Sequence, residues 1–333
     1  MKHKILWIGF GNFAKKIKVA VDARAETDVI YFHPSKEKAL ERFGEKACWN
    51  LDKVLSNAEL SSVFITSPND SHAFYLERCL LAHKHIFIEK PIAGYYSESN
   101  QLLDLFKQNN QVLMVGHNKR REVAIRTAKE LIETRTIGDV ISVYANDSKG
   151  IAYQMTQTNW RFQPSRHREG PLITVGIHLI EAVHYLVGRV DSVSSVLKNI
   201  SGLSAVPDSN ATMLHLERGV TAFIEANYNM PSVDVLNIYG TNGIINISDG
   251  QMWLRQGRDL NRVPAPSLPV ELKPIDTVAE EINEFFNAVE SDRNDVETGY
   301  KEGLQALAVI EACWRSSEQK RIVEMKEFEQ YAI

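Results

Sequence analysis

The first 120 residues alternate short apolar runs with amphipathic segments. Five runs rich in β-branched and aromatic residues predict strands: KILWIGFG, DVIYFH, SSVFITSP, HIFIEKP and QVLMVGHN. Segments of helical spacing separate them, such as residues 34–44, where Pro34 lies near the start and Gly44 lies past the end. This alternation predicts a parallel, doubly wound sheet. Ligands of such sheets bind beyond the carboxyl ends of the strands.

The pattern changes after residue 120. Residues 121–138 predict a helix, DVISVYANDS predicts a strand, and a largely apolar helix is expected from Pro171 to about Val187. Alternating runs between residues 190 and 256, with ERG and TNG between them, predict antiparallel hairpins. An irregular connection is expected around Pro264, Pro266 and Pro269, and two helices then close the chain. We expect two domains, residues 1–120 and 121–333, with the last helices able to pack back onto the first.

Composition narrows the class of protein. The net charge is -4 over 333 residues, which argues against a large nucleic-acid interface. We expect no signal peptide and no membrane span, because no apolar run is long enough. The cysteines Cys48, Cys79 and Cys313 are isolated, which favours a reducing, cytoplasmic compartment and buried thiols, without a metal site.

A glycine pattern follows the first predicted strand. In WIGFGNFAKK, Gly9, Gly11 and Ala14 form Gly-x-Gly-x-x-Ala. The first glycine permits the tight turn, the second lets a pyrophosphate approach the backbone, and a small third residue lets helix and strand pack closely. We therefore predict a dinucleotide site that includes Asn12 and Phe13.

Cofactor choice is expected at the end of the second strand, where an acidic residue would hold a ribose 2′-hydroxyl. The chain has His33 there, followed by Ser35 and Lys36. These residues suit a 2′-phosphate, so NADP is favoured over NAD. The alternative is that Lys36 and Lys38 form a solvated helix start.

Five motifs carry a family resemblance. GFGNFA, SPNDSHA, EKPIA, GHNKR and GIHLIE occur in the order and spacing of the glucose–fructose oxidoreductase, inositol dehydrogenase and rhizopine-catabolism family. Each motif is weak, but five in register are specific, and the resemblance covers nearly the whole chain. The resemblance implies a Rossmann domain followed by an α+β domain with an open, mostly antiparallel sheet. Such proteins commonly pair through the outer face of that sheet, so a homodimer or homotetramer is expected.

The tripeptide Glu89-Lys90-Pro91 ends the fourth predicted strand. Oxidation of a secondary alcohol needs a cation near the hydroxyl oxygen, because alkoxide charge develops there. Lys90 suits that role, Glu89 could orient it, and Pro91 fixes the backbone. The resemblance implies the same role for Lys90. A strand-end salt bridge is the structural alternative.

The apolar helix carries a second candidate. Thr174, His178, Glu181 and Tyr185 fall on one face. The resemblance implies that His178 is the general base or holds the substrate hydroxyl, as its ordinary pKa near 6.5 allows; a core histidine is the alternative. The inositol dehydrogenase branch has Asp where this chain has Thr174, which puts an inositol-type proton relay in doubt. Tyr153 and Tyr185 are further candidates for the proton.

The remaining site residues follow from strand ends and one loop. By resemblance, Ser67, Pro68 and Asn69 border the nicotinamide ribose, and His72 begins the next helix. Asn118 and Arg120 end the fifth strand, with a solvated helix start as the alternative for Arg120. The loop TNWRFQPSRHREG places Trp160 where it could stack on a sugar and Arg161 where it could bind an anionic group. An oligomer interface or a solvated loop is the alternative for this segment.

We therefore expect an NAD(P)-dependent oxidoreductase that acts on a secondary hydroxyl of a sugar, sugar acid, nucleotide sugar or cyclitol. Two alternatives stay open. One is a redox-neutral sugar-modifying enzyme that retains its cofactor. The other is a dinucleotide-sensing binding protein without catalysis.

Overall fold

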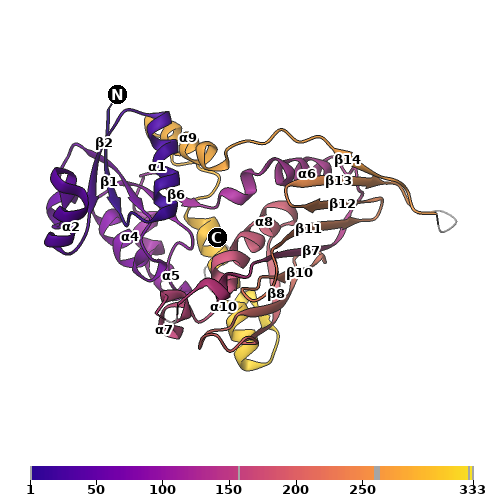
Figure 1. Cartoon of the computed structure of the whole chain (residues 1–333). Coiled ribbons are helices and arrows are strands. Elements are labelled where there is room, and N and C mark those ends of the chain that lie inside the picture. The colour runs from indigo at the N-terminus through magenta and orange to yellow at the C-terminus, as the bar shows by residue number, and fades with distance from the viewer. Residues whose placement is uncertain (1, 157, 259–262, 329–330, 332–333) are drawn as a thin grey trace. The chain divides into compact units, whose positions relative to one another are not determined.

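The chain divides into two units in this computed structural model, which describes residues 2–156, 158–258, 263–328 and 331. Unit 1 comprises residues 1–118 and 276–304, and unit 2 comprises residues 119–275 and 305–333 (Figure 1). The chain crosses from unit 1 to unit 2 for the last time within helix α10 (Tyr300–Gln319). Each unit is described by itself.

Unit 1 is built on a sheet in which every strand pair is parallel. The strand order is β3-β2-β1-β4-β5-β6. The strands are β1 (His3–Ile8), β2 (Thr27–Phe32), β3 (Ala47–Cys48), β4 (Leu60–Ile65), β5 (His85–Glu89) and β6 (Leu113–Gly116). This confirms the predicted Rossmann sheet. Strand β3 was not predicted, because two residues are too few to show a periodicity.

An aromatic row fixes one face of this sheet. Trp7, Phe64 and Phe87 lie on β1, β4 and β5, with ring centroids 4.8 and 5.3 Å apart. Phe285 of α9 (Thr277–Glu290) meets Phe64 edge-on at 5.4 Å. The other helices of unit 1 are α1 (Asn12–Arg24), α2 (Lys36–Phe43), α3 (Leu51–Leu55), α4 (His72–Leu81) and α5 (Tyr96–Lys107). Because these rings are fully buried and packed together, they fix the positions of β1, β4 and β5 and therefore of the turns that follow these strands.

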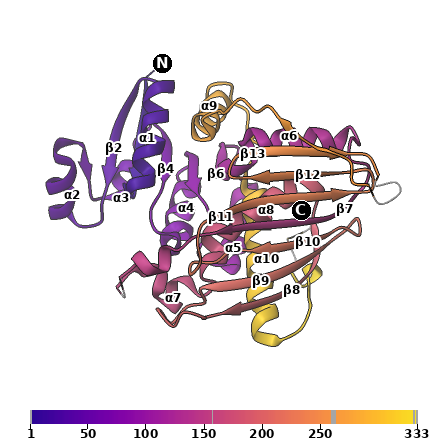
Figure 2. The ribbon, with the colours of Figure 1, turned by 45° about the vertical axis from the view of Figure 1, so that its right-hand side comes forward.

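Unit 2 is built on a nine-stranded sheet of order β14-β13-β12-β11-β7-β10-β9-β8-β15 (Figure 2). All its pairs are antiparallel except β7 with β10, as the resemblance implied. The strands are β7 (Val140–Ser148), β8 (Val190–Lys198), β9 (Ser209–Leu216), β10 (Thr221–Glu225), β11 (Val233–Gly240), β12 (Gly243–Ser248), β13 (Gln251–Gln256), β14 (Ser267–Val270) and β15 (Val323–Glu324).

The expected irregular connection near Pro269 is wrong in part. Residues 267–270 form strand β14, in which Pro269 lies opposite Trp253 of β13. Strand β14 is the edge of the sheet, and an edge strand tolerates a proline because one side needs no N–H donor.

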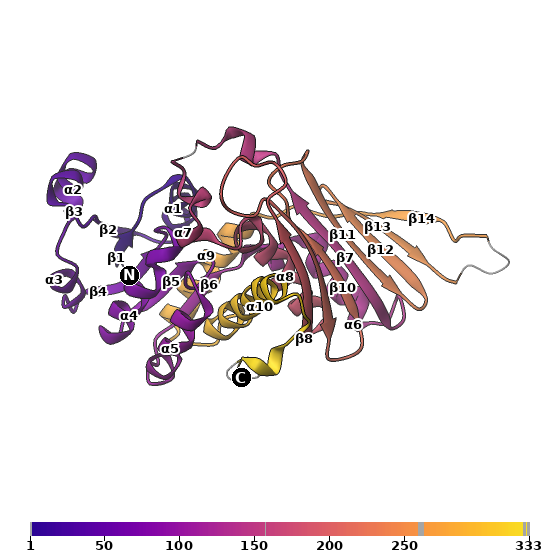
Figure 3. The same cartoon turned by 90° about the horizontal axis from the view of Figure 1, so that it is seen from below.

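The two faces of this sheet differ. Helices α8 (Ile177–Val187) and α10 lie on one face (Figure 3). That face carries fully buried residues such as Ala145 and Ile224. Among the described residues no helix lies on the other face, which carries Tyr144 and, in register with it, Phe223. The exposed fraction of Phe223 is 44%. Helix α6 (Val123–Glu133) packs against α8.

The apolar helix is found where it was predicted. Helical structure runs from Pro171 through the π-helical turn η6 (Leu172–Gly176) to the end of α8, and the short helix α7 (Pro164–His167) precedes it across a turn at residues 168–170. Together they span residues 164–187. It ends at Gly188, whose φ of 106° favours glycine. Its length and composition would allow it to cross a membrane, but 78% of its most apolar window is buried in the protein, as in a core helix.

A buried ion pair stabilises this helix. The guanidinium Nε of Arg120, in the turn η3 (Asn118–Arg121), donates to Glu181 Oε1 at 2.6 Å. The side chains are only 9% and 2% exposed. Breaking such a pair leaves an uncompensated buried charge.

We expect Glu181→Ala to lower the free energy of unfolding by about 3–5 kcal/mol, because Arg120 stays buried without its carboxylate. Urea unfolding of the whole chain measures it. Glu217→Ala, which removes the half-exposed partner of Arg189, is the control and should change little. Equal losses in the two variants would contradict this assignment.

Candidate active site

The turn after β1 allows another group to approach its backbone closely. Gly9 has a φ of 79°, and a Cβ there would collide with the backbone of Ser67. Gly11 caps α1, and a Cβ there would meet nothing within 4 Å. Ala14 is buried and Phe13 is 45% exposed. Within this fully described helix, no side chain caps the N-terminus and the first turn holds no acid, so the N–H groups of Asn12 and its neighbours suit a pyrophosphate.

The end of β2 lacks an acidic residue. His33 Nδ1 accepts from the Ser35 N–H at 3.0 Å, and Ser35 Oγ accepts from the Lys38 N–H at 3.4 Å. The Lys36 ammonium lies 5.0 Å from the centroid of the Trp49 ring. Lys36 is therefore held by a cation–π contact, although it remains exposed.

A cleft of about 500 Å³ begins at this strand end. Four aromatic residues line it together with an ion pair between Arg78 and Asp52. The lining residues are Phe32, Pro34, Trp49, Asn50, Leu51, Asp52, Phe74, Tyr75 and Arg78. Its size and aromatic walls suit a planar ring.

The turn after β4 holds an unsatisfied amide. Asn69 is 5% exposed, and neither of its amide atoms has a hydrogen-bond partner among the described residues. A buried amide without a partner calls for an explanation, and a bound ligand or a water would supply its hydrogen bonds. Ser67 Oγ accepts from Ser71, and Pro68 precedes Asn69 in the turn.

His72 joins two strand-end turns. It is 1% exposed, and its ring nitrogens lie 2.7 Å from the Pro91 carbonyl oxygen and 2.8 Å from that of Ser67. Burial lowers its pKa. A neutral imidazole has one N–H, so it donates to one of these two carbonyl oxygens. Both ring nitrogens face the protein backbone, which favours a role in positioning the turns.

The end of β5 carries Glu89 and Lys90, and the Lys90–Pro91 peptide is cis. Glu89 Oε1 is buried and has no hydrogen-bond partner among the described residues. A Cβ at Gly116 would lie 2.8 Å from this oxygen, so that glycine makes room for the carboxyl. Burial raises the pKa of Glu89 to about 7, against the lowering effect of Lys90.

In unit 2 the four residues of the predicted polar stripe fall into two groups, those that are partly exposed and those that bind other side chains. Between Pro171 and Val183, all of them described, only Thr174 and His178 are partly exposed. Glu181 is buried against Arg120, and Tyr185 accepts a bond from Arg126 at 3.0 Å. Thr174 and His178 are therefore the two polar positions that this stretch of helix leaves accessible.

Two expected substrate residues have internal partners. Arg120 is bound by Glu181, so it is not a solvated helix start. The Asn118 amide donates to Thr277 Oγ1 at 2.9 Å.

The loop before the helix packs on itself. In η5 (Trp160–Phe162), the Arg161 guanidinium lies 4.5 Å from the Trp160 ring centroid. This arrangement covers one face of the indole that was expected to stack on a sugar.

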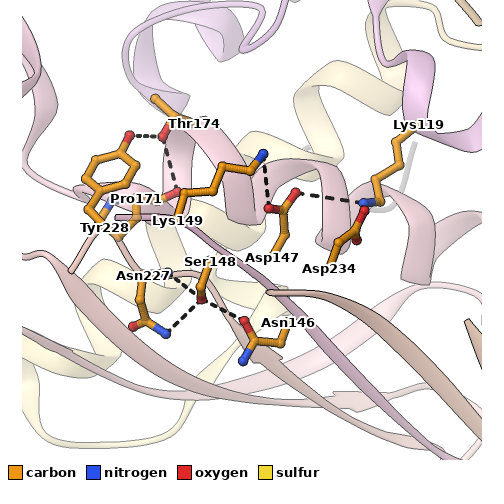
Figure 4. A network of polar contacts seen from close by, with 10 residues as sticks. All are labelled: Lys119, Asn146, Asp147, Ser148, Lys149, Pro171, Thr174, Asn227, Tyr228 and Asp234. Carbon is orange, nitrogen blue, oxygen red and sulfur yellow. Dashed lines mark hydrogen bonds and ion pairs between the residues drawn. The ribbon is translucent and has the colours of Figure 1, made fainter. Parts of the chain in front are cut away.

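A charged network at the end of β7 was not predicted from the sequence (Figure 4). The Asp147 carboxylate lies 3.3 Å from the Lys149 ammonium and 3.8 Å from that of Lys119, which also contacts Asp234 at 2.9 Å. Asp147 is 6% exposed, whereas the Lys149 side chain is 48% exposed. These residues come from three separate segments, so no local spacing could reveal them. No group of three or more potential metal ligands occurs in the described part of the chain.

Comparisons with known proteins give one family match within unit 1 and another within unit 2. Residues 3–117 match the model for an oxidoreductase family with an NAD-binding Rossmann fold, and residues 125–246 match the GFO/IDH/MocA C-terminal domain. Levoglucosan dehydrogenase of Pseudarthrobacter phenanthrenivorans is 27% identical, over 86% of each chain. Inositol 2-dehydrogenase of Rhizobium meliloti is 26% identical, over 94% of this chain and 96% of its own. A structure of levoglucosan dehydrogenase in complex with NADH and levoglucosan superposes with a TM-score of 0.86 at 25% identity, covering 98% of this chain and 100% of its own.

We expect Glu89→Gln to change the pH dependence of stability. A carboxyl whose pKa is raised to about 7 on folding, from about 4.3 unfolded, contributes stability at low pH that is lost as the pH rises through 7. Between pH 5 and 8 the wild type should lose roughly 2–3 kcal/mol at this group, and the variant should not. Urea unfolding across this range measures it, with the exposed Glu59→Gln as control. Parallel profiles for wild type and Glu89→Gln would contradict the buried carboxyl.

Proposed function

The chain belongs to the GFO/IDH/MocA family of oxidoreductases, and we propose that it transfers a hydride between a nicotinamide and a secondary hydroxyl of a sugar or cyclitol. The observation that carries the proposal is the edge of unit 1. There Gly9, Gly11, the unsatisfied Asn69 amide and the Glu89-Lys90 pair end neighbouring parallel strands. This edge would suit a dinucleotide, and in our proposal Lys90 lies beside the reacting end of the cofactor.

In this proposal a bound nicotinamide would supply the acceptor or donor of the hydride, and the side chains of this chain would stabilise charge and hold protons. Lys90 donates a hydrogen bond to the substrate oxygen and stabilises its developing negative charge. His178 takes the hydroxyl proton, because an imidazole can serve as a general base. The Glu89 carboxyl beside Lys90 is protonated or ionised depending on the pH, because burial raises its pKa to about 7.

We propose that the adenosine end lies at the end of β2. The aromatic cleft would hold the adenine, and Lys36, with His33 and Ser35 beside it, would meet a 2′-phosphate. The absence of an acidic side chain at the tip of this described strand favours NADP.

The wider assignments are also proposals. Unit 2 would bind the substrate, with Trp160 and Arg161 as contacts that need the loop to open. One face of its sheet carries no helix of the described residues and exposes Phe223, and this face would suit pairing with a second copy in a homodimer or homotetramer. The isolated, mostly buried cysteines favour the cytoplasm.

We expect Lys90→Met to lower kcat about 10²–10³-fold, because the ammonium that stabilises alkoxide charge is lost. The assay follows the absorbance of reduced nicotinamide with NAD and NADP, each offered with levoglucosan, glucose 6-phosphate, myo-inositol and xylose. Lys107→Met, an exposed lysine on α5, is the matched control.

The outcomes separate the three candidate functions. Turnover that Lys90→Met abolishes supports the dehydrogenase. Sugar conversion without net cofactor consumption favours the redox-neutral enzyme. Cofactor binding with no chemistry on any panel member favours the sensor.

We expect Lys36→Ala to raise the KM for NADP about 10–100-fold and to leave that for NAD unchanged, because one charge-assisted bond to phosphate is lost. Lys38→Ala, on the same helix, is the matched control. Equal changes for both cofactors would contradict a 2′-phosphate contact at Lys36.

A further inference from the structure

The charged network at the end of β7 brings two carboxylates together. Asp147 of β7 lies opposite Asp234 of β11 in register, and like charges in such a position repel. The Lys119 ammonium offsets this repulsion, because it lies 2.9 Å from Asp234 Oδ1 and 3.8 Å from Asp147 Oδ2. Burial alone would lower the pKa of Lys119, but the neighbouring carboxyls, that of Glu122 among them, raise it overall. Lys119 is therefore a fixed charge inside the network.

The second lysine of the network is more exposed. The Lys149 side chain is 48% exposed, whereas that of Lys119 is 10% exposed. The Lys149 ammonium lies 3.3 Å from Asp147 Oδ1 (Figure 4), yet this buried oxygen accepts no hydrogen bond from the described residues. The contact is thus an attraction between charges that leaves the three N–H donors of the ammonium to other acceptors.

The network lies beside the accessible stretch of the helix in unit 2. Asp147 follows Ala145 by two residues, so it points to the face of the sheet on which α8 lies. Ala226 lies beside Asp147, because β10 and β7 pair in parallel register up to the residues before them. A Cβ added at Gly176 in the turn η6 would lie 3.4 Å from the Ala226 Cβ, and His178 follows two residues later.

A backbone contact gives Lys149 the same position. Its N–H donates to the Asn227 carbonyl oxygen at 2.8 Å. The next residue, Tyr228, is hydrogen-bonded through its phenol to Thr174 of η6 (Figure 4). The half-exposed ammonium therefore belongs to the same region of unit 2 as the two partly exposed polar residues of the helix.

The charges of the network indicate which ligand it suits. It contains two cations and three acids, Lys119, Lys149, Asp147, Asp234 and Glu122. Burial raises the pKa of Glu122, and the four other charges cancel. The network thus has no surplus positive charge with which to hold a phosphate or a carboxylate. A hydroxyl oxygen needs only a donor, and the ammonium supplies one.

We propose that Lys149 donates a hydrogen bond to a hydroxyl oxygen of an uncharged sugar or cyclitol, and that Asp147 is a positioning residue that holds the ammonium. The inference rests on the proposed function and deepens it, since it selects uncharged substrates among the sugars. The oxygen that Lys149 contacts does not react, so this bond is equally strong in the ground state and the transition state. Its loss should raise KM and leave kcat nearly unchanged.

Variants of Lys149 test the inference in the whole chain with the assay above. Lys149→Met keeps the length of the side chain but removes the donor, and it should raise the KM for uncharged sugars of the panel about 10–100-fold. Lys149→Gln retains an N–H donor and should recover part of this loss. Lys198→Met, at the exposed end of β8 in the same sheet, is the matched control and should change nothing.

A variant of Asp147 separates recognition from structure. Asp147→Asn frees Lys149 and leaves the network with a surplus positive charge. It should raise the KM for uncharged sugars about 10-fold and strengthen the binding of glucose 6-phosphate by a similar factor. A purely structural role for Asp147 would weaken both kinds of sugar alike, and that result would overturn its positioning role.

An unchanged KM in Lys149→Met, or an equal rise in Lys198→Met, would overturn the inference. A wild-type preference for glucose 6-phosphate that Lys149→Met removes would overturn it as well, since Lys149 would then bind an anion. If the wild type turns over no panel sugar, the proposed function fails first. Calorimetric binding of the same sugars in the presence of NADH or NADPH then decides the inference separately. Weaker binding of uncharged sugars by Lys149→Met supports it, and unchanged affinity or no sugar binding overturns it.

Discussion

The proposed cofactor site lies at the edge of unit 1 where the strands end. It depends on the parallel pairing of β1, β4, β5 and β6. Ile8, Ile65, Ile88 and Val115 lie in register across the four strands. Each chain segment must therefore leave the sheet at the same edge, one or two residues later. Gly9, Ser67 and Glu89 meet there for that reason. The packed rings of Trp7, Phe64 and Phe87 resist any slip, because a shift by one residue would send them to the opposite face.

In unit 2 the corresponding constraint is the burial of charge. The helix presents four polar residues on one face, and the structure uses them in two ways. Glu181 must be paired because it is buried, and Arg120 supplies the pair. Once these charges neutralise each other, the accessible polar groups are the hydroxyl of Thr174 and the imidazole of His178. The ion pair thus separates the part that stabilises the helix from the part that can meet a ligand.

The sequence was informative where function follows from the end of a strand. The positions of Gly9, Asn69 and Lys90 could be predicted, because apolar runs locate strands and parallel strands end together. Contacts between distant segments could not. Arg120 and Glu181 are 61 positions apart, and Thr174 and Tyr228 are 54 apart. No periodicity relates such residues. Strand β14 was missed for another reason, since its Pro269 indicates a loop unless the strand lies at an edge.

Thr174 adds no charge to this face of the helix. The resemblance implies Asp at this position in the inositol dehydrogenase branch, and a carboxylate there would lie one helical turn before His178. An anion at that distance would favour the charged form of an imidazole, whereas a hydroxyl carries no charge and has no such effect. In this chain the buried carboxylate of the face is Glu181, and it is already paired with Arg120. The polar contacts of Thr174 are hydrogen bonds, such as the one it donates to the Pro171 carbonyl oxygen at 3.3 Å. The part of the helix that is partly exposed therefore offers hydrogen bonds in place of a negative charge.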